Sequence, residues 1–231
     1  NINFFEWIDL SKNLNPCEYQ KRLLESTVLI VGVGGIGSTV VEILARLGVG
    51  RFIIVDFDIV EESNLTRQSG FKKSDIGKSK VEVIQRNIQA ISDSKVVTIS
   101  KQLRCKNDLE KLFKSYSFDI ALCCADTPSI EIDYWFDDLA HKYNKPIIVG
   151  SYASTVINYL HIIPGETISL REFYGNFMIS DDHILNSKTP YSVISPISYM
   201  AAAIISYKVL DSLRGLLNIT NYIQIDCMNF E

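Results

Sequence analysis

Between residues 27 and 150, short apolar runs alternate with stretches whose apolar residues recur at helical spacing. Residues 27–33 (TVLIVGV) are continuously apolar and rich in β-branched side chains, as expected for a strand that is buried on both faces. The next segment has apolar residues at helical spacing, and Gly48 is placed to cap that helix. Residues 52–56 (FIIVD) form the next expected strand, so the pattern predicts a β-α-β unit.

The same alternation continues along the chain. Strands that alternate with helices favour a mostly parallel sheet that is covered on both faces. We therefore expect an α/β protein with a Rossmann-like, doubly wound fold. The further elements that the pattern predicts are helices at 79–92, 109–116 and 130–143 and strands at 95–100, 118–124 and 146–150.

The regular alternation of expected strands and helices ends after residue 150. Residues 156–163 (VINYLHII) and 222–226 are expected strands, and a long apolar helix is expected at 198–217. We expect the two C-terminal strands to extend the same sheet.

Length and composition narrow the class of protein. The 231 residues fit one large domain, which we place at 26–231, after an N-terminal arm at 1–25 that continues from a missing upstream segment. The formal net charge of −4 predicts no general attraction to nucleic acid. No apolar run approaches the length of a membrane span, so no membrane association is expected.

The spacing of the cysteines and histidines argues against a zinc site built from this chain. The five cysteines include no C-x-x-C pair, and the three histidines are far apart, so we expect no zinc site from this chain. The cysteine number is odd, and the start of the chain does not resemble a signal peptide. A reducing, cytoplasmic compartment is the simplest interpretation.

A glycine-rich turn lies between the first expected strand and helix. Gly32, Gly34 and Gly37 form a G-x-G-x-x-G pattern, with Gly35 inside it, which favours close backbone approach to phosphates at a helix N-terminus. Asp56 ends the second strand, 19 residues after Gly37, where a carboxylate can bind ribose hydroxyls. The pattern predicts nucleotide binding but does not distinguish ATP from NAD or FAD.

Polar and cationic residues are concentrated after the second strand. Asp58, Asn64, Arg67, Gln68 and Lys80 follow it in order. Such groups suit a triphosphate, because cations stabilise the negative charge of its transition state. Taken singly, Arg67 and Lys80 are also compatible with solvated surface charges.

A further acid follows another buried strand. Asp126 leaves residues 118–124 at the edge of the sheet where ligands bind, and its carboxylate is able to hold Mg²⁺. The alternative is a helix cap. Cys123 and Cys124, in the apolar strand itself, are most simply interpreted as packed thiols and not as nucleophiles.

Five short motifs together resemble the ThiF/MoeB/HesA superfamily, the relatives of ubiquitin-activating enzyme. The resemblance covers nearly the whole chain and implies an ATP-binding adenylation domain that transfers AMP to a carboxylate. It implies that Asp56 binds the ribose, that Asn64, Arg67 and Lys80 contact the ATP phosphates, and that Asp126 is a magnesium ligand. The motifs are GVGGIG at 32–37, DFD at 56–58, NLTRQ at 64–68, GKSK at 77–80 and AD at 125–126.

Departures from the family pattern indicate which subgroup of the family this chain resembles most. The two C-x-x-C zinc pairs of many members are missing, and no cysteine occurs between Cys124 and Cys227, so the usual catalytic-cysteine region at 180–199 has none. A thioester step on this chain is therefore doubtful. Residues 15–20 and 64–80 look most like the microcin-C type peptide adenylating enzymes.

The resemblance implies a homodimer that adenylates the C-terminus of a ribosomally made peptide in natural-product biosynthesis. Two alternatives remain open: activation of a ubiquitin-like sulfur-carrier protein, and a non-catalytic scaffold that binds a leader peptide for a partner enzyme. The family also uses an arginine that reaches the partner subunit's ATP, and here that arginine is expected upstream of Asn1. Lys21 and Arg22 are poorer candidates for it.

Overall fold

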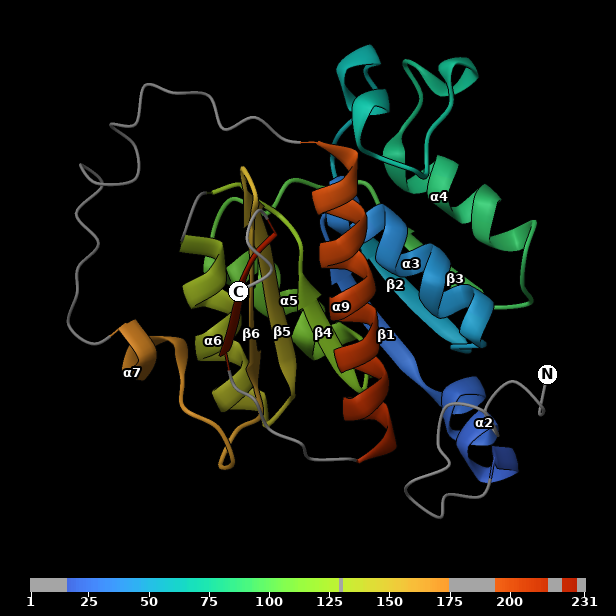
Figure 1. Ribbon diagram of the computed structural model, residues 1–231. Coiled ribbons are helices and arrows are strands. Elements are labelled where there is room, and N and C mark those ends of the chain that lie inside the picture. Colours follow the sequence, from blue (N-terminus) through green and yellow to red (C-terminus); the bar gives the residue numbers. More distant parts are fainter. Residues whose placement is uncertain (1–15, 129–130, 175–193, 216–221, 228–231) are drawn as a thin grey trace.

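Seven strands form one sheet in the order β3-β2-β1-β4-β5-β6-β7 (Figure 1). The computed structural model describes residues 16–128, 131–174, 194–215 and 222–227. Strands β3, β2, β1, β4 and β5 are parallel, and β6 and β7 continue the sheet antiparallel. The bounds are β1 Thr27–Val31, β2 Arg51–Val55, β3 Lys95–Ile99, β4 Ile120–Cys123, β5 Ile147–Ala153, β6 Val156–Ile162 and β7 Tyr222–Asp226.

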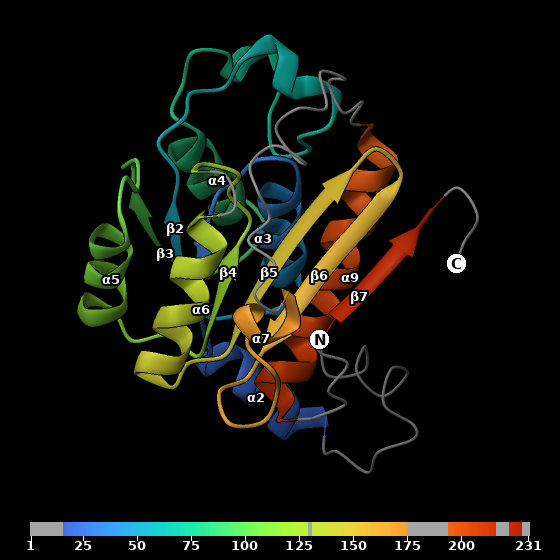
Figure 2. The same cartoon turned by 90° about the vertical axis from the view of Figure 1, so that its left-hand side faces the viewer.

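Helices cover both faces of the sheet. Figure 2 shows α5 and α6 on one side of the strands and α3 and α9 on the other, and α7 packs beside α6. Two short 3-10 helices, η1 (Glu62–Thr66) and η2 (Lys73–Asp75), lie between β2 and α4. The α-helices are α2 Pro16–Glu25, α3 Gly35–Leu47, α4 Lys80–Gln89, α5 Lys106–Ser115, α6 Glu131–Tyr143, α7 Leu170–Tyr174 and α9 Ser195–Arg214.

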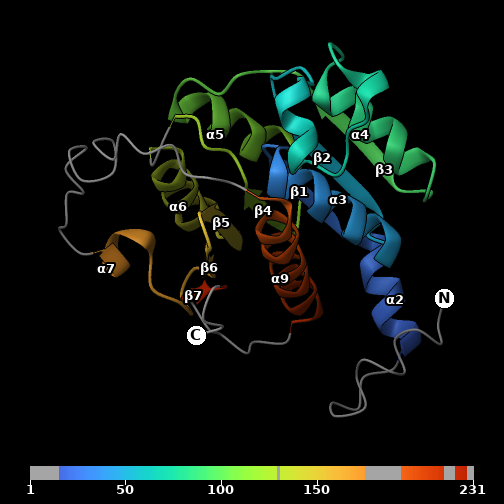
Figure 3. The ribbon, with the colours of Figure 1, turned by 45° about the horizontal axis from the view of Figure 1, so that its top comes forward.

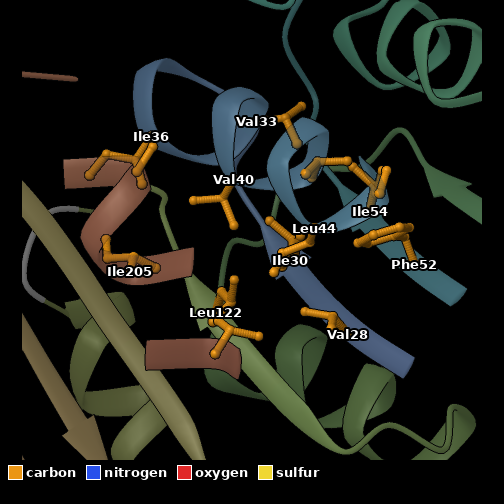
Figure 4. Packing of buried hydrophobic residues seen from close by; sticks show 14 of the residues in the cluster. Val28, Ile30, Val33, Ile36, Val40, Leu44, Phe52, Ile54, Leu122 and Ile205 are labelled. Atoms are coloured by element: carbon orange, nitrogen blue, oxygen red, sulfur yellow. The ribbon is translucent and has the colours of Figure 1, made fainter. Parts of the chain in front are cut away.

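Each central strand contributes to two separate cores because its side chains alternate between the faces. Val28 and Ile30 of β1 belong to the cluster under α3 and α9, whereas Leu29 and Val31 belong to the cluster under α5 and α6. Figure 4 shows the first cluster, in which Val40 and Leu44 of α3 lie among side chains of β1, β2, β4 and α9. Burial on both faces explains the continuous apolar runs of these strands.

The sequence correctly predicted the doubly wound fold and the extension of its sheet by C-terminal strands. Several boundaries differ for local reasons. Strand β1 ends at Val31, before Gly32 turns the chain with a φ of 89°. The last helix starts at Ser195 and ends at Arg214, where Gly215 adopts the left-handed conformation that caps it. Strand β5 reaches Ala153 because it pairs with β6 along its whole length.

Some of the predicted features lie outside the described residues. These are residues 1–15 of the expected N-terminal arm, Ile130 at the start of the expected helix 130–143, and most of the region 180–199. The rest of the arm, Pro16–Glu25, forms α2, which buries Tyr19 and Leu23 in the core under α9. Within the described ranges, no helix combines the length and apolar character that crossing a membrane requires.

The order of the strands places a crevice at the carboxyl ends of β1 and β4. From β1 the chain passes into α3 on one face, and from β4 it passes into α6 on the other. The loops after these two neighbouring strands therefore separate, and open α/β sheets bind their ligands at such a point. Figure 3, with this edge turned toward the viewer, shows the start of α9 close to the segment that follows β2.

A buried ion pair holds the segment between β2 and α4. Asp75 of η2 is 1 % exposed, and its two carboxylate oxygens accept hydrogen bonds from Arg86 of α4 at 2.9 and 3.1 Å. Lys78 donates a further bond at 3.2 Å. The Arg86 guanidinium lowers the pKa of Asp75 to about 2, against the opposing effect of burial.

We expect Asp75→Asn to lower the free energy of unfolding by about 2 kcal/mol, the range of hydrogen bonds to charged groups. A carboxyl group whose pKa is lowered by folding stabilises the protein above its unfolded pKa. The stabilisation by Asp75 should therefore be lost as the pH falls from about 4 toward 2. Urea unfolding of both proteins between pH 3 and pH 7 measures this, and a constant difference across that range would contradict it.

Candidate active site

The glycine turn after β1 is built so tightly that side chains are excluded. A Cβ atom on Gly32 would lie 2.7 Å from the backbone nitrogen of Ala125, and one on Gly37 would overlap the Gly32 carbonyl oxygen. Gly34 is the N-cap of α3, where no side chain caps the helix and no acidic residue occupies its first turn. The N-terminal N–H groups of α3 are thus available to an anion.

Asp56 fixes this turn to the end of β2. Its Oδ2 accepts the backbone N–H of Val33 at 2.7 Å, and its Oδ1 accepts that of Asp58 at 2.9 Å. Sequence reasoning assigned Asp56 to the ribose and gave no sign of these bonds. Each oxygen keeps a further lone pair, so the same carboxylate is able to hold the loop and accept a hydroxyl group.

Lys80, the first residue of α4, is buried beside Asp58. Its side chain is 6 % exposed, and its Nζ donates to Asp58 Oδ2 at 2.8 Å, while Asp58 is 45 % exposed. The expected alternative of a solvated surface charge is therefore wrong for Lys80. An ammonium has three donors, so two remain for a phosphate at this position.

Asn64, Arg67 and Gln68 lie on or just after η1. The Asn64 Oδ1 accepts the Glu61 backbone N–H at 3.0 Å, so this side chain also caps its own turn. Arg67 is half-buried, and its carbonyl accepts a bond from Ser198 Oγ of α9 at 3.3 Å. This bond ties the turn to the start of α9.

Asp126 lies in the loop after β4 and lines the same cavity as this cluster. It is exposed, and Thr127 Oγ1 donates to its Oδ1 at 3.3 Å. A solvent-accessible carboxylate is a hard oxygen donor, which suits Mg²⁺. Across the described residues, no group of three or more His, Cys, Asp or Glu side chains is able to hold a metal ion. Magnesium usually needs only one or two carboxylates together with substrate phosphates, so Asp126 fits such a shared site.

One cavity of about 750 Å³ joins these groups, a volume typical of small-molecule sites. Gly37 is the one predicted residue that does not line it, because it packs inside the turn. The predicted residues that line the cavity are Gly32, Gly34, Gly35, Asp56, Asp58, Asn64, Arg67, Gln68, Lys80 and Asp126.

Other residues of the site had no signal in the sequence. A Cβ atom on Gly35 would meet the hydroxyl of Tyr152 and would lie 2.8 Å from Ser198 Oγ. Tyr152 comes from β5 and Ser198 from α9, so both reach the glycine turn only through the fold. Neither belongs to a recognisable motif, and motif spacing was therefore unable to predict them.

The neighbouring cysteines at the end of β4, Cys123 and Cys124, are protonated thiols at neutral pH. Burial, together with the negative charge of Asp133, raises the pKa of Cys123 well above its usual value and that of Cys124 to about 12. Cys123 Sγ donates a hydrogen bond to Asp133 Oδ1 at 3.2 Å. These properties agree with packed thiols and not with nucleophiles.

The chain belongs to the ThiF family, because the model of that family matches residues 9–231. Curated relatives include the probable adenylyltransferase/sulfurtransferase MoeZ of Mycobacterium tuberculosis, 36 % identical over 132 residues, and the sulfur carrier protein adenylyltransferase of Thermus thermophilus, 34 % identical over 135 residues. The matches cover 57 % and 58 % of this chain but only 33 % and 48 % of those relatives.

Solved structures similar to this chain include those of Escherichia coli MccB. The complex of MccB with ATP is 28 % identical, with a TM-score of 0.85 over 99 % of this chain and 68 % of the other. The complex of this microcin C7 biosynthetic enzyme with N-formylated MccA is 28 % identical, with a TM-score of 0.86 over 100 % of this chain and 70 % of the other.

Proposed function

We propose that this protein is an ATP-dependent adenylyltransferase that activates the C-terminal carboxylate of a ribosomally made peptide in natural-product biosynthesis. The observation that carries the proposal is one cavity that is lined by the uncapped start of α3, Arg67, the buried Lys80 and the exposed carboxylate of Asp126. Positive groups and an exposed carboxylate in the same cavity fit a triphosphate with its metal ion.

In this reaction a carboxylate oxygen of the substrate attacks the α-phosphorus of ATP. The bond from that phosphorus to the bridging oxygen breaks, pyrophosphate leaves, and an acyl adenylate forms. No general base is needed because the carboxylate is already ionised at neutral pH. The protein contributes position and charge stabilisation.

Each residue then has a defined part. Asp56 binds the ribose while it holds the glycine turn. Asn64, Arg67 and Lys80 contact the phosphates and stabilise the charge that leaves with pyrophosphate. Asp126 would hold Mg²⁺, which when bound supplies further positive charge to the phosphates.

The peptide is supported by the structural similarity to MccB, which was solved in complex with N-formylated MccA and superimposes on 100 % of this chain. The sulfur-carrier alternative is supported by the sequence match to the sulfur carrier protein adenylyltransferase, 34 % identical over 58 % of this chain. Carboxylate-dependent exchange of labelled pyrophosphate into ATP, with peptides and with a sulfur-carrier protein as substrates, separates the two. A non-catalytic scaffold would support exchange with neither.

We expect the site to bind ATP with Mg²⁺ and to discriminate against NAD. Lys80 and Arg67 bring positive charge into the cavity, which suits a triphosphate, and hydride transfer has no need of them. Calorimetric titration with each nucleotide measures the difference. Tight binding of NAD without binding of ATP would overturn the adenylation proposal.

We also propose that the protein is a cytoplasmic homodimer. The five cysteines are free thiols, which suits a reducing compartment. Helix α9 exposes Tyr199, Ala203 and Tyr207 at helical spacing, a face suited to packing across a twofold axis. Light scattering at tens of micromolar protein should give twice the mass of the chain, and a monomer would contradict the dimer.

A further inference from the structure

The cavity extends beyond the predicted nucleotide residues onto the outer strands. This part is called here the strand lobe. It lies on the face of β5, β6 and β7 whose side chains pack in one core cluster with those of α6 and α7. Figure 1 shows where these helices and strands lie in the fold. None of the described residues that line the strand lobe is cationic, and Asp133 is its only acid. The residues of the strand lobe are Ile132, Asp133, Tyr134, Val149, Ser151, Asn158, Leu160, Leu170 and Tyr222.

The carboxylate of Asp133 has only a weak hydrogen-bond donor as its side-chain partner. It lies in the first turn of α6, and its Oδ1 accepts a bond from the Cys123 thiol at 3.2 Å. A thiol is a weak donor, so this bond offsets little of the cost of burying a carboxylate. Burial raises the pKa of Asp133 to about 6, with the Cys123 bond opposing the shift.

The next acids along α6, Asp137 and Asp138, do not line the cavity, which makes Asp133 different from them. Asp138 accepts from Lys106 at 2.7 Å and from Arg171 at 3.2 Å. Asp137 accepts backbone N–H groups at the start of α7, although its buried Oδ1, 3.4 Å from His141 Nε2, has no hydrogen-bond partner. These two acids secure α7, whereas Asp133 faces the cavity.

The cation of α7, Arg171, is already engaged elsewhere. Arg171 lies over the ring of Tyr134, with 4.8 Å between its Cζ and the ring centroid, and it is paired with Asp138. Asp133 therefore has an unused capacity to accept hydrogen bonds, in a lobe whose other residues are uncharged. A ligand that brings a donor to this point gains a charge-assisted bond, and a ligand that brings a carboxylate meets repulsion.

We propose that Asp133 selects the last side chain of the substrate, and that it accepts a hydrogen bond from a carboxamide or an ammonium group on that side chain. The inference rests on the proposed function, since a carboxylate that reacts near Asp126 brings its own residue into the same cavity. Acidic and apolar side chains are disfavoured because they leave the partly buried carboxylate repelled or unpaired.

The test uses peptide pools that are randomised upstream and fixed at the last residue as Asn, Lys, Leu or Asp. Pyrophosphate exchange with the wild-type protein should be at least about tenfold faster for the Asn and Lys pools than for the Leu and Asp pools. The change Asp133→Asn removes the charge and keeps the shape. It should lower the ratio of the Lys pool to the Asp pool at least about tenfold.

Glu131→Gln is the matched control because Glu131 lies in the same turn of α6, is exposed, and does not line the cavity. It should leave the ratios unchanged. Equal rates for the four wild-type pools, or a Lys-to-Asp ratio unaffected by Asp133→Asn, would overturn the selection by Asp133.

A binding measurement separates this proposal from the proposed function. Calorimetry of the same pools, with a non-hydrolysable ATP analogue present, measures the binding affinity for each pool without the adenylation reaction. Absence of exchange with every pool would contradict the adenylation proposal. The order of the binding affinities of the four pools would still show whether Asp133 selects the last side chain. Thermal unfolding of Asp133→Asn checks that the variant is folded.

Discussion

Replacing Lys80 by methionine is expected to lower the rate of pyrophosphate exchange by two to three orders of magnitude. Its ammonium is buried at the start of α4 and lines the cavity beside the glycine turn. A charge fixed in a site from which water is largely excluded needs no reorganisation when negative charge develops on the phosphates. Loss of one such preorganised contact typically costs about 3 to 4 kcal/mol of transition-state stabilisation.

The change should spare the fold. Methionine fills a similar volume, and the partner that it leaves behind, Asp58, is 45 % exposed and stays solvated. Lys78→Met is the matched control, because Lys78 is half exposed, pairs with Asp75 and does not line the cavity. Exchange that survives in Lys80→Met, together with a lowered free energy of unfolding of that variant, would assign Lys80 a purely structural role beside Asp58.

The parts of the fold that the sequence predicted are those determined by local pattern. Strands buried on both faces form continuous apolar runs, and a glycine turn between a strand and a helix has its own spacing. The parallel order then follows, because helices that alternate with such strands must cover both faces. Consequently the glycine turn, Asp56 and Asp126 were all placed correctly at the carboxyl edge of the sheet.

What the sequence did not predict depends on contacts between distant segments. The pair Lys80–Asp58 joins residues 22 positions apart, and the bond from Ser198 to Arg67 spans 131 positions. Tyr152 reaches Gly35 only because β5 lies two strands away from β1. Such contacts have no periodicity or spacing that a single sequence reveals.

The sequence also gives no sign that Asp133 differs from the other acids of its helix. In the sequence it is one of four acids in α6, and nothing distinguishes it from Asp137 and Asp138. In the structure Asp133 is the one acid of α6 that lines the cavity, and the Cys123 thiol donates a hydrogen bond to it. The difference lies in what surrounds each carboxylate, which only the packed helix determines.

The second large effect is expected from Asp126→Asn, which should lower the rate of pyrophosphate exchange about a hundredfold. The amide keeps the shape of the side chain and removes its charge, so the residue that would hold Mg²⁺ loses most of its attraction for a hard cation. With that cation bound, the charge on the departing pyrophosphate is neutralised, and losing one such electrostatic contact costs about 3 kcal/mol. Because the loss falls on the chemical step, the maximal rate should fall more than the apparent affinity for ATP.

Stability provides the independent readout for this residue. Asp126 is exposed and bonded to Thr127 at 3.3 Å, so Asp126→Asn should shift the free energy of unfolding by less than about 0.5 kcal/mol. If Asp126 were instead a helix cap, the variant would lose about 1 kcal/mol of stability and keep its exchange activity. Glu131→Gln again serves as the control, since it removes one nearby negative charge outside the cavity. A wild-type protein that binds ATP and peptide but never exchanges pyrophosphate would favour the non-catalytic scaffold.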